Sequence, residues 1–151
     1  IPFKQNIINL YNCFRMDKKF KVSIEKQEDD SYIAYNTNMS GCTIIGTGDS
    51  VAAAKKDFLD SMAGVAEAKR ELGEEVPEAF SNVPDYKFDL SSLFEYYKMI
   101  NVSAFARFVG INDTLMRQYR KGNTYISDAQ LQKIEDGIHQ LGNEFSRLQL
   151  V

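Results

Sequence analysis

The residues best suited to binding chemistry lie between Ser103 and Gly122, in the run SAFARFVGINDTLMRQYRKG. Polar and positively charged side chains recur there among apolar ones, and such side chains contact the phosphates and base edges of DNA. Their chemistry indicates binding of double-stranded operator DNA. The candidate DNA-binding residues are Ser103, Thr114, Arg117, Gln118, Arg120 and Lys121.

Each of these side chains suits a particular part of the duplex. Arg117 matches O6 and N7 of guanine, and Gln118 matches N6 and N7 of adenine. Thr114 suits a thymine methyl group or a phosphate. The other three suit phosphates, which set the register of a protein on DNA more than its base preference: Ser103, Arg120 and Lys121.

Two short helices joined by a tight turn must position these residues. Ala106 is small, as the crossing point of two helices requires, and Gly110 accepts the positive φ of a tight turn without steric cost. We expect Ser103 to cap the first helix, and Asn112 or Asp113 to cap the second. The apolar residues that would bury this helix-turn-helix are Phe105, Val109, Ile111, Met116 and Tyr119.

A competing interpretation is a small helical bundle without a DNA role. An Ala-x-x-x-Gly bend also suits such bundles, and charged residues on a helix often only solvate it.

One helix-turn-helix makes few contacts, so DNA binding predicts a homodimer or higher homo-oligomer that contacts half-sites about 34 Å apart. The long final helix or the edge of a sheet would supply the contact between copies.

The rest of the chain indicates a sheet and a covering helix. Apolar and polar residues alternate over 20–26, which predicts a half-buried strand, and further strands are expected at 32–35 and 42–46. Apolar residues then repeat every three or four positions over 51–72, which predicts a helix that covers the sheet. A last long helix is expected after Ser127. We therefore expect an α+β fold, with a small antiparallel sheet under a long helix, followed by an all-helical domain.

Charge divides the chain in the same way, although the net charge of the whole is only −3. Residues 16–80 hold eight basic and thirteen acidic residues, a net charge of −5, whereas residues 98–125 hold five basic residues and one acidic residue, a net charge of +4. This asymmetry indicates different partners. We divide the chain into an N-terminal extension at 1–15, a partner-binding domain at 16–80, a linker or short strand at 81–89 and a DNA-binding domain at 90–151.

The N-terminal part resembles the HicB family, the antitoxins of bacterial HicA–HicB toxin–antitoxin pairs. The segment VSIEKQEDDSYIAY at 22–35 is similar to the family's hairpin with an acidic tip followed by G-Y-V-A. MSGC at 39–42 resembles the family's L-P-G-C turn, and GDS at 48–50 with Ala54 resembles the G-D-T/S start of its helix. A helix-turn-helix C-terminal half is one of the two DNA-binding ends known in this family.

The resemblance implies a partial RNase H-like fold and a HicA-like toxin, a basic RNA-cleaving protein that the acidic domain would bind and cover. The protein would then be an antitoxin-like regulator that neutralises the toxin and represses its own operon. The alternative is a free-standing DNA-binding transcription regulator whose N-terminal domain senses a ligand or a protein. The candidate partner-binding residues are Glu25, Glu28, Asp29, Asp30, Tyr32 and Tyr35.

A divergent metal-dependent nuclease is a third and weaker interpretation. RNase H chemistry needs several carboxylates around two metal ions, whereas Asp29 and Asp30 fall at a hairpin tip and Asp57 and Asp60 on the polar face of a helix. We therefore expect no enzyme activity, catalytic residue, metal or cofactor.

No apolar run approaches the roughly 20 residues that span a bilayer. Two cysteines are too few for a disulfide scaffold. From the apolar runs and the cysteine count together, we expect a cytoplasmic protein without membrane contact.

Overall fold

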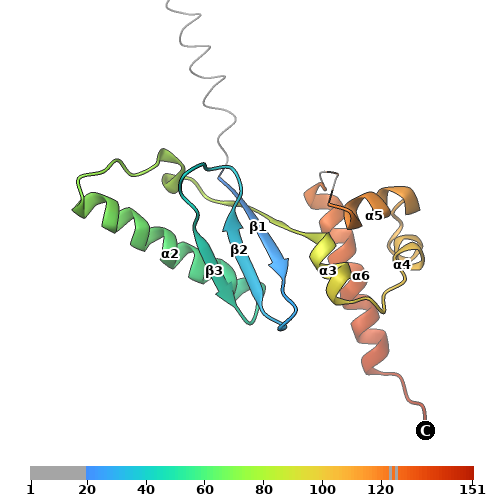
Figure 1. Cartoon of the computed structure of the whole chain (residues 1–151). Helices are drawn as coiled ribbons and strands as arrows, with labels where there is room; N and C mark the ends of the chain where they lie inside the picture. The colour runs from blue at the N-terminus through green and yellow to red at the C-terminus, as the bar shows by residue number, and fades with distance from the viewer. Residues whose placement is uncertain (1–19, 123, 125) are drawn as a thin grey trace, which may run out of the picture. The chain divides into compact units, whose positions relative to one another are not determined.

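The computed structural model describes residues 20–122, 124 and 126–151. The chain divides into two compact units between Phe88 and Asp89 (Figure 1). The first unit combines a sheet with a long helix, and the second consists of helices, which confirms the expected mixed α+β composition. The extension expected at residues 1–15 lies outside the described residues.

Within the described residues, the first unit contains four strands, one long helix and one short 3-10 helix. In chain order these are β1 (Lys21–Lys26), β2 (Tyr32–Asn36), β3 (Ile45–Gly48), α2 (Val51–Glu71), η1 (Glu78–Ser81) and β4 (Asp85–Phe88). In β1, Val22 and Ile24 are buried while Lys21 is exposed, as a strand with one buried face requires. α2 begins where the Ser50 hydroxyl accepts a hydrogen bond from the backbone N–H of Ala53 at 3.1 Å.

The four strands lie in the order β3-β2-β1-β4. β2 pairs with β1 and with β3 in antiparallel fashion, whereas β4 runs parallel to β1. The prediction of an antiparallel sheet is therefore wrong for the fourth strand. The chain passes through α2 and η1 before it returns to the sheet, and a connection of this length permits parallel pairing. Within the stretch 81–89, for which the sequence permits a linker or a strand, residues 85–88 form β4.

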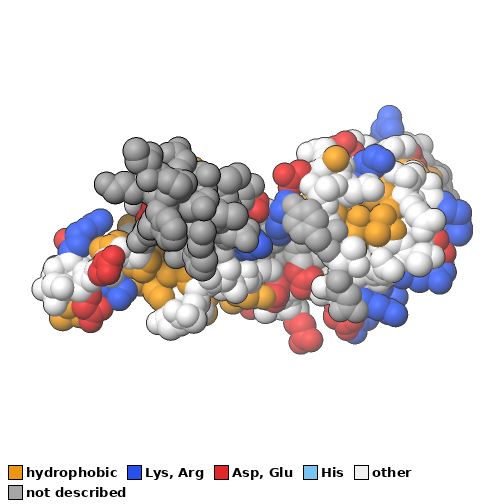
Figure 2. Space-filling model, turned by 90° about the horizontal axis from the view of Figure 1, so that it is seen from above, with side chains coloured by type: hydrophobic (Ala, Val, Ile, Leu, Met, Phe, Trp, Pro, Cys, Tyr) orange, Lys and Arg blue, Asp and Glu red, His pale blue; other side chains and the backbone are white. Residues whose placement is uncertain are grey.

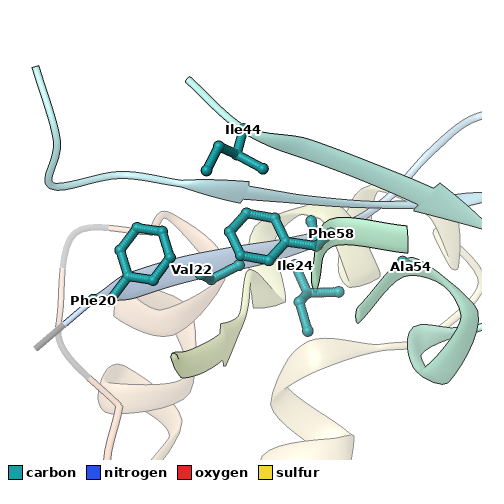
Figure 3. Packing of buried hydrophobic residues seen from close by; sticks show 7 residues of the cluster. Phe20, Val22, Ile24, Ile44, Ala54 and Phe58 are labelled. Atoms are coloured by element: carbon teal, nitrogen blue, oxygen red, sulfur yellow. The ribbon is translucent and has the colours of Figure 1, made fainter. Parts of the chain in front are cut away.

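α2 covers one face of the sheet, and the core of the first unit lies between them (Figure 1). Figure 3 shows Phe20 and Phe58 side by side in this core, with their ring centroids 5.7 Å apart. Gly46 lets α2 come close to β3, because a Cβ there would lie 2.1 Å from the backbone nitrogen of Phe58. The buried residues of this core are Phe20, Val22, Ile24, Ala34, Ile44, Ala54 and Phe58.

The second unit contains α3 (Leu90–Tyr96), α4 (Val102–Val109), α5 (Asp113–Arg120) and α6 (Asp128–Ser146). Asn112 caps α5 and Ser127 caps α6, as expected. The prediction that Ser103 caps α4 is wrong, because the side chain of Asn101 accepts the hydrogen bond from Ala104 N–H at 3.0 Å. Asparagine and serine cap helices about equally well, so residue type alone does not rank two candidates so close in the chain.

Aromatic and aliphatic side chains pack the four helices together. Phe94 of α3 and Phe105 of α4 meet edge to face, with ring centroids 6.2 Å apart. α6 approaches α4 at Gly137, where a Cβ would lie 2.2 Å from Cγ1 of Val109. Val109 is itself half-buried. The other four apolar residues that the sequence assigned to this core are buried: Phe105, Ile111, Met116 and Tyr119.

Candidate nucleic-acid interface

A left-handed glycine joins α4 to α5. Gly110 has φ 72° and ψ 34°, a conformation that costs a side chain without special hydrogen bonding about 1 kcal/mol or more. The backbone N–H of Ile111 then bonds to the carbonyl of Ala106 at 2.9 Å, which closes the end of α4. Ala106 is fully buried. The two small residues therefore have the places that the sequence predicts, one inside the helix pair and one at its turn.

α5 turns one face inward and presents the other to solvent. Met116 and Tyr119 are buried, and Oδ1 of Asn112 accepts hydrogen bonds from the N–H groups of Thr114 and Leu115 at 2.9 and 3.2 Å. Helical periodicity places the polar residues between these anchors on the outer face. The exposed residues of this face include five of the six DNA-binding candidates: Thr114, Arg117, Gln118, Arg120 and Lys121.

The sixth candidate, Ser103, lies on α4 and is half-buried. Its hydroxyl accepts a hydrogen bond from Nη2 of Arg117 at 3.2 Å. The same nitrogen donates to Oδ2 of Asp113 at 2.6 Å. Two of the predicted residues thus meet at one guanidinium group, and Asp113 joins them. Sequence reasoning treated Asp113 only as a possible cap and missed this contact, although its spacing of four residues from Arg117 is typical of ion pairs on a helix.

Gln118 and Arg120 of α5 also lie close to neighbouring groups. The hydroxyl of Thr124 donates a hydrogen bond to Oε1 of Gln118 at 3.4 Å. The pKa of Glu95 lies below its ordinary value, mainly because Lys98 donates a hydrogen bond to its carboxylate and attracts it, with a smaller attraction from Arg120. In Figure 2, Lys and Arg side chains are visible at several places around the margin of the second unit.

In the first unit, two of the predicted partner-binding residues share the sheet face opposite α2. The hydroxyl of Tyr35 donates a hydrogen bond to the carboxylate of Glu25 from the neighbouring strand. Glu25 pairs with Ile33 across the ladder, and Tyr35 pairs with Ile45, which is 48% exposed. We call the four residues Glu25, Ile33, Tyr35 and Ile45 the open sheet face.

Three acidic candidates form the tip of the hairpin between β1 and β2. Asp29 accepts a hydrogen bond from Ser31 N–H at 3.0 Å, and hydrogen bonds from Ser31 lower the pKa of its carboxyl group. Asp30 adopts a positive φ of 70° and forms an ion pair with Lys26, whose side chain is only 3% exposed. Glu28 is exposed. Two of the three carboxylates therefore stabilise the turn itself.

The last candidate, Tyr32, packs on the α2 side of the sheet. Its ring meets that of Phe88 edge to face with centroids 6.2 Å apart, and Nζ of Lys26 lies 4.2 Å from the ring centroid. Tyr32 and Tyr35 are three positions apart in one strand, so the period of two already places them on opposite faces. The structure therefore brings Glu25 and Tyr35 together and separates Tyr32 from them.

Within residues 20–122, 124 and 126–151, no three His, Cys, Asp or Glu side chains lie close enough together to hold a metal ion. No helix in the described part of the chain combines the length and the apolar character needed to cross a bilayer. The chain matches none of the protein-family models, curated proteins or solved structures with which it was compared.

Proposed function

We propose that this protein is an antitoxin-like transcriptional regulator. Its second unit acts as a helix-turn-helix that binds operator DNA, and its first unit, a partial RNase H-like domain, neutralises a HicA-type RNA-cleaving toxin in the cytoplasm. The observation that carries the proposal is the turn at Gly110 between α4 and α5, together with the exposed polar face of α5. A helix held in this way can enter the major groove and place its side chains on base edges.

The DNA contacts follow from the positions of the side chains on α5. Arg117 and Gln118 lie in its middle and are exposed, so they are assigned to guanine and adenine edges. Arg120 and Lys121 at its end are assigned to phosphates, and Thr114 at its start to a thymine methyl group or a phosphate. Ser103, on α4, is the candidate whose hydroxyl accepts a hydrogen bond from Arg117.

A selection from a pool of random DNA duplexes tests the DNA-binding half of the proposal. We expect the full-length protein to enrich one sequence motif. Arg117→Ala or Gln118→Ala should relax base preference at single positions and cost about 1–3 kcal/mol each, whereas Lys121→Ala should weaken binding to all sequences and lower the salt slope by about one. Failure of the wild-type protein to enrich any sequence would reject DNA binding.

The first unit supplies the proposed toxin contact. Residues 20–88 hold seven basic and thirteen acidic residues, a net charge of −6, so a basic partner is favoured electrostatically. The open sheet face places the apolar side chains of Ile33 and Ile45 beside the Glu25–Tyr35 pair, and this combination of an apolar centre with a carboxylate suits a cationic protein surface.

Co-expression with the product of an adjacent small gene tests the toxin contact. We expect that product to arrest growth, wild-type protein to restore growth and Ile45→Arg to fail. Val83→Arg is the matched control, because Val83 is 89% exposed outside the sheet. If no adjacent gene encodes a growth-arresting protein, or if Ile45→Arg still restores growth, this assignment of the first unit is wrong. A free-standing regulator with a sensing domain is then the remaining interpretation.

We also propose that the protein binds DNA as a homodimer through α6. Ile134 in the first half of α6 is buried, whereas Phe145 near the end of α6 and Leu148 just after it are 68% and 65% exposed. Glu144 and Arg147 are the chain neighbours of these two residues and are also exposed, so this segment carries both charges and is suited to a second copy of itself. The edge of β3 is less suited, because the backbone N–H of Thr47 already donates to Asp57 of α2 at 2.8 Å.

A further inference from the structure

We infer that Asp113 is a positioning residue for Arg117, so that the base preference of α5 depends on a carboxylate that does not itself contact a base. This inference rests on the proposed DNA binding by α5. It concerns the ion pair between Asp113 and Arg117 and the hydrogen bond from Arg117 to Ser103.

Two side chains, one from each of two helices, hold the guanidinium group of Arg117. Nη2 of Arg117 lies 2.6 Å from Oδ2 of Asp113 and 3.2 Å from Oγ of Ser103. Asp113 is one helical turn before Arg117 on α5, and Ser103 comes from α4 across the turn. The Arg117 side chain is nevertheless 59% exposed, so the guanidinium group is oriented without being enclosed.

Capping of α5 does not account for the position of the Asp113 carboxylate. Asn112 already accepts hydrogen bonds from the first N–H groups of the helix, those of Thr114 and Leu115. Oδ1 of Asp113 is buried and has no hydrogen-bond partner among the described residues, and Oδ2 is directed to Arg117. The carboxylate therefore mainly orients Arg117. Its negative charge also stabilises the N-terminus of α5.

Orientation matters because an arginine side chain loses much rotational freedom when it is fixed. Recognition of guanine O6 and N7 requires two N–H groups in a fixed fork, and a guanidinium group carries five. Asp113 and Ser103 together engage both hydrogens of Nη2, and either fork of the group includes Nη2. The Ser103 hydroxyl therefore releases its hydrogen bond when a base binds, whereas Asp113 keeps its contact and one fork is open to guanine. If the side chain is held before DNA binds, less entropy is lost on binding the correct base.

Asp113 should also lower the affinity for DNA that lacks guanine at the position read by Arg117. An unpaired carboxylate at this end of α5 would repel phosphates, and pairing with Arg117 neutralises it. When the arginine finds no guanine, its contact with Asp113 competes with a simple phosphate contact. Asp113 should thus lower affinity for unrelated sequences while it raises the preference for the matching base.

The experiment measures base preference of full-length variants on the duplex motif enriched by the wild-type protein. Asp113→Asn should reduce the preference for guanine at the Arg117 position about tenfold, while binding to an unrelated duplex stays equal or becomes stronger. Ser103→Ala should act in the same direction with a smaller effect. Asp128→Asn is the matched control, because Asp128 is likewise the first residue of a helix after its cap.

Three outcomes overturn the inference. Unchanged guanine preference in Asp113→Asn does so, and so does an additional loss when Asp113→Asn is combined with Arg117→Ala, since a positioning residue has no effect without the residue it positions. An equal loss in Asp128→Asn would indicate a general effect of charge at helix ends. If wild-type protein enriches no motif, the proposed DNA binding itself fails, which is a distinguishable result.

Discussion

In the first unit, one buried hydroxyl group, that of Tyr86, lowers the stability of the fold. The ring of Tyr86 meets that of Phe58 edge to face with centroids 6.4 Å apart, and Nζ of Lys55 lies 4.8 Å from the Tyr86 ring centroid. The Tyr86 hydroxyl, however, is buried without a hydrogen-bond partner among the described residues, and burial raises the pKa of Tyr86 above its ordinary value of 10.0. The ring stabilises the core, whereas the hydroxyl costs free energy.

Tyr86→Phe should therefore leave the free energy of unfolding of the first unit unchanged or raise it by about 1 kcal/mol. The ring contacts with Phe58 and Lys55 remain, and only the unpaired hydroxyl is removed. Urea unfolding followed by circular dichroism measures the change. A loss of more than about 1 kcal/mol would mean that the hydroxyl has a favourable partner in solution.

The same substitution should alter the response to alkaline pH. Because folding raises the pKa of Tyr86, ionisation of its hydroxyl costs more free energy in the folded than in the unfolded protein. Stability is therefore highest below the unfolded pKa and falls as the pH rises through the folded pKa. Wild-type protein should lose more stability than Tyr86→Phe between about pH 8 and about pH 11. Equal losses in the two proteins would contradict this assignment.

At the scale of elements, the contact between β3 and α2 is decided by one glycine. A Cβ on Gly46 would lie 2.1 Å from the nitrogen of Phe58 and 2.5 Å from the carbonyl oxygen of Ala54, both of which are backbone atoms of α2. Neither atom can move without shifting the helix. Gly64 in the same helix is the opposite case, because nothing lies within 4 Å of the Cβ it would carry.

Gly46→Ala should destabilise the first unit by about 1–3 kcal/mol or more, because the added methyl group forces α2 away from the sheet. Gly64→Ala is the matched control and should stabilise the unit by up to about 1 kcal/mol, because alanine is the better helix former. Thermal unfolding of both variants provides the comparison. Changes of the same sign would show that the close approach of α2 to β3 does not limit packing.

At the scale of the whole molecule, the proposed function requires two copies of the chain. The exposed part of α5 contributes three cations, Arg117, Arg120 and Lys121, and each phosphate contact adds only modestly to DNA affinity. A dimer doubles the contacts and reads two half-sites one helical turn apart. The exposed apolar end of α6 is the surface assigned to this contact.

Phe145→Glu should convert the dimer to a monomer, because it places a carboxylate in the centre of the assigned interface. Leu72→Glu is the control, because Leu72 is comparably exposed at 74% but lies at the end of α2. Light scattering coupled to size-exclusion chromatography gives the mass of each variant. A wild-type protein that stays monomeric at about 100 μM, far above the Kd of a functional dimer, rejects the interface, as does a dimer that persists in Phe145→Glu.

The sequence by itself determined the features that depend on neighbours along the chain. Alternation predicted β1, helical spacing predicted α2, and the small residues at 106 and 110 predicted the turn between α4 and α5. These features are local, because side-chain periodicity and the φ preference of glycine act within a few residues. Exposure of the polar face of α5 followed from the same periodicity.

Only the tertiary structure decided which distant residues meet. The parallel pairing of β4 with β1 joins segments about 60 residues apart, and the approach of Gly137 to Val109 depends on how α6 docks on α4. The hydrogen bond from Arg117 to Ser103 likewise crosses from one helix to another. Such contacts depend on the packing of whole elements, and a periodic pattern specifies the face that is buried but not the element that covers it.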